Sequence, residues 1–146
     1  MGIFRGANRP PVHGVAPFIE PGLYRLRIRV CKEVLSRKND ELFIVEFDVL
    51  ESDNPKFAPG TVLAWSANMR HGETALINCK AFAAAVLDCE DEEVTEAVLD
   101  RLVTREQPAA GIQLHAHAFN IQTATVPPHP FTKVRWDSAA SEARIA

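Results

Sequence analysis

The fold of this chain is decided by residues 22–51, which read GLYRLRIRVCKEVLSRKNDELFIVEFDVLE. Two runs of alternating apolar and polar residues flank a polar turn. The first run sets Tyr24, Leu26, Ile28 and Val30 on one face against Arg25, Arg27 and Arg29 on the other. The second run sets Phe43, Val45, Phe47 and Val49 against Glu46 and Asp48. Successive side chains of a strand point to opposite faces, so the pattern predicts two half-buried strands joined by the turn at residues 36–40 into a long antiparallel hairpin.

Outward from this hairpin the sequence predicts three more strands and two helices. The strands are expected at Thr61–Met69, Ile112–Thr123 and Phe131–Asp137, and the helices at Ala75–Leu87 and from Asp91 to about Arg105. Thr74 is the expected N-cap of the first helix, and Pro108 and Gly111 are expected to stop the second. Alternation in the fourth strand predicts that His115, His117 and Phe119 share its polar face.

The order of these elements predicts an all-β fold with a helical insertion between the third and fourth strands. That order is the layout of a five-stranded OB-fold barrel, and a flat five-stranded sheet in an α+β domain is the alternative. The domain is expected to span residues 18–138. Residues 1–17 form a predicted flexible, basic N-terminal arm, and residues 139–146 form a C-terminal tail.

Composition narrows the class of protein. The 146 residues are 47% hydrophobic and 24% charged, which is ordinary for one globular domain, and no apolar run approaches a membrane span. Cys31, Cys79 and Cys89 form no CxxC pair, and the N-terminus lacks the apolar core of a secretory signal. We therefore expect buried thiols and a cytoplasmic location. The net charge of −3 argues against a basic surface overall, but not against a local basic groove.

The outward arginines of the first strand are the first candidate binding residues. Their guanidinium groups are expected about 7 Å apart on one face, close to the phosphate spacing of an extended single strand. Arginine suits phosphate because its planar fork donates two hydrogen bonds at once. The alternative is that Glu46 and Asp48 on the partner strand pair with these arginines across the hairpin.

Aromatic residues interleaved with basic residues give the second candidate surface. Single-strand binders combine a basic groove with rings on which bases stack, whereas core packing is the alternative for each ring. The complete set of candidate nucleic-acid-binding residues is Arg25, Arg27, Arg29, Lys32, Arg37, Lys38, Trp65, Arg70, Phe119, Phe131, Lys133, Arg135 and Trp136.

A metal site is the third candidate. His115 and His117 point the same way on a strand, and His71, His129 or Glu33 could supply further ligands through folding. The sequence has no phosphate-binding glycine loop, GxSxG, HExxH or CxxC motif. We therefore expect no cofactor, no resident metal and no enzymatic activity.

With these elements the chain resembles a phage-encoded single-stranded DNA-binding protein of the OB-fold type. The resemblance rests on residues 21–24 with the arginine-rich strand, residues 43–51, residues 59–65, the alanine-rich helix with Phe82, and residues 131–136. It implies sequence-independent protection of single-stranded DNA in replication or recombination, usually as an oligomer, together with replication or recombination proteins and in the host cytoplasm. The chain departs from the family at residues 141–146, which are not the acidic tail that recruits partners in many members.

Two other functions remain open from the sequence. One is a structural or assembly β-barrel module that associates through strand edges and has no role with nucleic acid. The other is a metal-dependent enzyme that uses His115 and His117.

Overall fold

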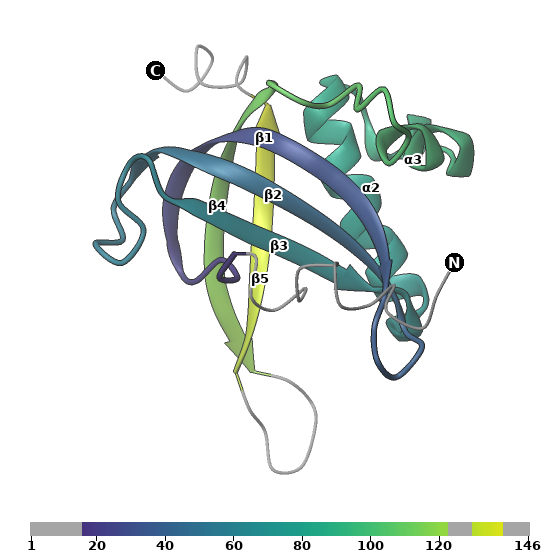
Figure 1. The fold of residues 1–146 in the computed structure, drawn as a ribbon, viewed down its shortest axis with the longest axis horizontal. Helices are drawn as coiled ribbons and strands as arrows, with labels where there is room; N and C mark the ends of the chain where they lie inside the picture. The colour runs from purple at the N-terminus through teal and green to yellow at the C-terminus, as the bar shows by residue number, and fades with distance from the viewer. Residues whose placement is uncertain (1–15, 123–129, 139–146) are drawn as a thin grey trace, which may run out of the picture.

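Five antiparallel strands form one sheet in the order β3-β2-β1-β4-β5. The structure is a computed structural model that describes residues 16–122 and 130–138. The strands are β1 (Gly22–Leu35), β2 (Glu41–Ser52), β3 (Val62–Asn68), β4 (Gln113–Gln122) and β5 (Pro130–Ser138). Figure 1 shows β1, β2 and β3 crossing over β4 and β5. The predicted hairpin is therefore present, and β1 is the central strand of the sheet.

The helices lie between β3 and β4, as the sequence predicts. They are the 3-10 turn η2 (Met69–His71), α2 (Glu73–Leu87), the 3-10 turn η3 (Asp91–Glu93) and α3 (Glu96–Leu102). The fold is thus all-β with a helical insertion between the third and fourth strands, which confirms the predicted fold class. None of the helices in the described ranges is both long enough and apolar enough to cross a membrane.

β1 is bent, and it pairs with β2 on one side and with β4 on the other. Its first half pairs with β4 from Gly22 to Arg27, and it pairs with β2 from Tyr24 to Leu35. The β1–β2 register shifts between Ile28 and Val30, and a bulge of this kind bends a strand. The shift also corrects the predicted inner face: Cys31 is fully buried, whereas Val30 is only half-buried.

The sheet does not close, because no strand pairing joins β3 to β5 in the described residues. Aromatic side chains span this opening. Trp65 of β3 and Trp136 of β5 meet edge to face with ring centroids 5.3 Å apart, and Phe82 of α2 lies 5.6 Å and 5.2 Å from them. Phe43 and Phe47 of β2 complete the cluster. Helix α2 therefore seals the side of the sheet that backbone hydrogen bonds leave open.

The second predicted helix is shorter than expected. Val94 and Thr95 are extended, and the Thr95 side chain accepts a hydrogen bond from the backbone N–H of Val98, which starts α3 as a separate helix. A side-chain oxygen at the N-cap satisfies one of the free N–H groups of the first turn. The expected N-cap of α2 also differs, since Gly72 occupies that position and Thr74 lies inside the helix.

Residues 16–19 lie along the edge of β3, where Phe18 forms an isolated parallel bridge with Ala64 and Ile19 packs in the main core. The backbone of Pro17 and Ile19 hydrogen-bonds to Ala64, and Ala16 packs in a small apolar cluster with Ile44 and Ala64. Ala16 and Pro17, which the sequence groups with the N-terminal arm, thus lie against the sheet. The rest of the predicted arm and the C-terminal tail lie outside the described residues.

Candidate nucleic-acid interface

The arginines of β1 are paired with carboxylates on β2. Arg25 contacts Glu51 at 3.0 Å, Arg29 contacts Asp48 at 3.0 Å, and Arg27 contacts the same carboxylate at 3.5 Å. Such partly exposed pairs add little to stability, but they place a negative charge next to each guanidinium. The ion-pair alternative therefore describes all three arginines in this structure.

Two further candidate cations are paired in the same way. Lys32 contacts Glu46 at 2.6 Å, and the Glu46 side chain is 10% exposed. Arg70 approaches Asp40 at 3.8 Å, and Asp40 also accepts a hydrogen bond from Asn68. These two cations are offset by carboxylates before any ligand arrives.

Arg37 and Lys38 lie in the turn between β1 and β2. Both side chains are exposed, and neither forms an ion pair with a residue in the described ranges. They stand at the turn end of β1, whereas β4 pairs with the opposite end of that strand. The structure therefore does not bring the turn cations together with those of β5.

Trp65 and Trp136 lie inside the protein. They are 7% and 8% exposed, and both belong to the aromatic cluster that spans the opening between β3 and β5. A ring that is packed on both faces offers no surface to a base. Core packing, the alternative for these two rings, is what the structure shows, so neither ring belongs to an exposed candidate surface.

The remaining candidates converge on the outward side of β4 and β5. Burial alternates along β5, with Lys133 and Arg135 exposed and Val134 and Trp136 turned inward. In the β4–β5 register, His117 is opposite Arg135 and Phe119 is opposite Lys133. Directly opposed residues share a face of the sheet, so these four side chains form one patch. We call Leu23, His117, Phe119, Lys133 and Arg135 the outer β4–β5 face.

This face combines free positive charge with exposed apolar surface. Neither Lys133 nor Arg135 forms an ion pair with a residue in ranges 16–122 and 130–138. His117 and Phe119 contact one another with ring centroids 5.2 Å apart. Leu23, which pairs with His117 from the β1 side, is 55% exposed. The side chain of Phe131 lies outside what the structure describes.

The neighbouring row of the same face is mixed in charge. Arg25, His115 and Asp137 are opposite one another across β1, β4 and β5. Asp137 and Glu51 therefore limit the positive patch on that side. The basic, aromatic part of the face lies toward the end where β4 and β5 connect.

The described residues give no support to a metal site. No group of three or more His, Cys, Asp or Glu in them is placed to hold an ion, and His129 lies outside them. The thiols give no sign of a nucleophile either. Burial raises the pKa of Cys31 to about 12 and that of Cys79 to about 11, which keeps both protonated at neutral pH.

The sequence-based set of nucleic-acid-binding residues does not include Leu23 or His117, although His117 was a candidate metal ligand. The alternation that places Phe119 outward also places His117 outward, so the signal for His117 was present. Leu23 could not be found in this way, because its position opposite His117 depends on the β1–β4 register.

No protein family model matches the chain, and no curated protein matches it.

Proposed function

We propose that this protein binds single-stranded DNA through the outer β4–β5 face, without preference for base sequence. The observation that carries the proposal is the pairing of Phe119 with Lys133 and of His117 with Arg135. Each pair sets a ring beside a cation that has no carboxylate partner in the described part of the chain. Rings stack on bases and cations contact phosphates, which together suit a single strand of any sequence.

The topology supports the same proposal. We infer that the sheet is an OB-type barrel whose seam between β3 and β5 is left open and filled by aromatic side chains. The loop between the fourth and fifth strands is one of the two loops beside which such barrels bind oligonucleotides. Phe119 and Lys133 lie near the ends of β4 and β5 that this loop connects.

Charge distribution makes the proposal compatible with the negative net charge. Acidic residues gather on the helical insertion, in η3 and α3, whereas Lys133 and Arg135 stand on the sheet. Local potential steers a polyanion more than net charge does. Roles in replication or recombination, an oligomeric state and partner proteins belong to the resemblance and are part of the same proposal.

The direct test is fluorescence anisotropy with labelled oligo-dT at low and high salt. We expect binding that weakens steeply between about 50 and 200 mM salt, because each phosphate contact releases counterions. Failure to bind at the lower salt concentration would contradict the proposal.

Removal of the two free cations locates the site. We expect Lys133→Ala with Arg135→Ala to weaken binding by about tenfold or more, since each cation donates charge-assisted hydrogen bonds. The slope of log affinity against log salt should fall by about 1.4, or about 0.7 for each lost phosphate contact.

The matched control is Arg27→Ala with Arg29→Ala, which removes the same charge from the same sheet. Both arginines are already paired with Asp48, so we expect a smaller loss of affinity and a nearly unchanged salt slope. Equal losses in the two double variants would place the DNA elsewhere.

Assembly through a strand edge is the second candidate function. The edge of β5 away from β4 pairs with no strand in the described residues, and a free edge is a template for another chain. Light scattering that shows a large assembly, in a preparation that retains no oligo-dT, would favour this function.

A further inference from the structure

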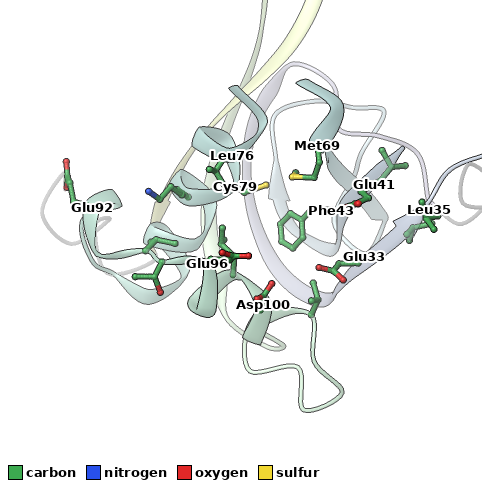
Figure 2. A pocket seen from close by; sticks show the side chains of 17 residues that line it. Glu33, Leu35, Glu41, Phe43, Met69, Leu76, Cys79, Glu92, Glu96 and Asp100 are labelled. Atoms are coloured by element: carbon green, nitrogen blue, oxygen red, sulfur yellow. The ribbon is translucent and has the colours of Figure 1, made fainter. Parts of the chain in front are cut away.

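A groove of about 1010 Å³ separates the turn end of the β1–β2 hairpin from α2 and α3. Its wall is largely apolar and includes Phe43, Met69, Leu76, Cys79, Leu99 and Val103. Figure 2 shows the Phe43 ring facing the space between the hairpin and the helices, with Leu76 and Cys79 on the α2 side. Leu35 and Leu76 are 60% and 44% exposed at its edge, so the groove offers apolar surface that the described residues leave uncovered.

Carboxylates surround this apolar wall. They come from both sides of the groove and are Glu33, Glu41, Glu92, Glu96 and Asp100, with Lys80 as the single amine. Figure 2 places Glu33 opposite Glu96 and Asp100. None of the five carboxylates forms an ion pair with a residue in the described ranges, unlike Glu46, Asp48 and Glu51 on the other side of the hairpin.

The chemistry of the groove specifies its ligand. The described acidic residues are not arranged as a metal site, so a cation alone does not account for them. An apolar wall with an unpaired acidic rim is complementary to a peptide that carries apolar and basic side chains and no acidic ones.

We propose that residues 1–15 of the same chain bind in this groove. Their sequence, MGIFRGANRPPVHGV, contains Ile3, Phe4, Arg5 and Arg9 and no Asp or Glu. The apolar residues match the wall of the groove, and the two arginines match its rim. The proposal does not depend on DNA binding, because it concerns a different surface.

The position of Ala16, where the described residues begin, favours residues 1–15 of the same chain over a segment of another protein as the occupant of the groove. Ala16 packs with Ile44 and Ala64, and Val34 and Leu42 pack against that cluster. Val34 and Leu42 also line the groove. Fifteen residues span at most about 50 Å when extended, which is ample for a site that begins beside Ala16.

A truncated protein that begins at Ala16 tests the proposal with a labelled synthetic peptide of residues 1–15. We expect the peptide to bind the truncated protein and to bind the full chain at least tenfold more weakly. The reason is that the tethered segment competes at a high effective concentration. Absence of peptide binding to the truncated protein, with circular dichroism showing that it is folded, would overturn the proposal.

Charge reversal tests whether the groove is the site. Glu33→Lys with Asp100→Lys in the truncated protein should weaken peptide binding at least tenfold, and a peptide with Arg5→Glu and Arg9→Glu should recover part of that loss. The matched control is Glu90→Lys with Glu106→Lys, two exposed residues outside the groove, which should leave the affinity within about twofold. Equal effects of the two double variants would overturn the assignment to the groove.

Concentration dependence separates the same chain from a second copy. If each segment binds its own groove, light scattering should give the same number of subunits for the full chain and the truncated protein at every concentration. A full-length dimer that becomes a monomer on truncation would overturn the proposal in favour of exchange between copies.

Discussion

Phe119 is the residue on which base stacking depends in the proposed site. Its ring is half-buried on the outer side of β4, next to His117 and opposite Lys133. We expect Phe119→Ala to lower the affinity for oligo-dT by about 1–3 kcal/mol, the usual value of one base–aromatic stack. Anisotropy at a single low salt concentration measures the loss.

Ile121→Ala is the control for this substitution. Ile121 lies two residues after Phe119 on the same strand and is 39% exposed. Its replacement by alanine therefore removes apolar surface but no aromatic ring. Phe119→Tyr should retain most of the affinity. Equal losses for Phe119→Ala and Ile121→Ala would mean that stacking does not contribute.

The alternation of the sequence already indicates that two of the candidate binding residues, Trp65 and Trp136, face the core. Period-two alternation puts Trp136 on the face opposite Arg135, and it puts Trp65 in line with Leu63 and Ala67. Both tryptophans are buried as a result. The ion pairs of Arg27 and Arg29 with one carboxylate are different, because they follow from a register that the alternation leaves undefined.

Helix α2 is the element that holds the open sheet together. Phe82 is fully buried and contacts Trp65, Trp136, Phe43 and Phe47. We expect Phe82→Ala to lower the free energy of unfolding by about 3–5 kcal/mol, the usual cost of deleting a buried aromatic ring. Urea unfolding followed by circular dichroism provides the measurement.

Ile77→Ala in the same helix serves as the comparison. Ile77 is 54% exposed, so its loss should change stability by less than about 1 kcal/mol. A small effect of Phe82→Ala would show that something other than α2 holds the open sheet together.

Element types were predictable, but two boundaries were not. The strands and the helical insertion follow from hydrophobic periodicity, which depends only on local sequence. The bulge after Ile28 is invisible to periodicity because Val30 and Cys31 are both apolar and either could face inward. The break before α3 depends on Thr95 capping a new helix, and the acidic run before it masks that signal.

At the scale of the whole molecule, buried thiols make stability depend on alkaline pH. The pKa values of Cys31 and Cys79 are raised by burial above 9.0, which is the ordinary value taken for the unfolded chain. Above pH 9 the unfolded chain therefore loses protons that the folded chain keeps. Stability is fully present below pH 9 and falls as the pH rises toward 11–12, by about 3 kcal/mol per thiol near the upper end.

Urea unfolding at pH 8 and pH 10.5 measures this dependence. Burial also raises the pKa of Tyr24, which adds to the fall in the same direction. The informative comparison is therefore with Cys31→Ala. In this variant the free energy of unfolding should decrease less between pH 8 and pH 10.5. An unchanged fall in that variant would exclude Cys31 as a cause.

The contact between Trp65 and Trp136 makes the chain its own optical probe. These are the only two tryptophans in the sequence, and they come from the two edge strands of the sheet, which do not pair with each other in the described residues. Two indole rings held this close couple electronically, so their signature in circular dichroism reports their mutual orientation. Any event that parts β3 from β5 would remove that coupling and expose both rings to water, which shifts their emission to the red. Opening of the sheet can therefore be followed in the unlabelled protein, separately from loss of its strands and helices.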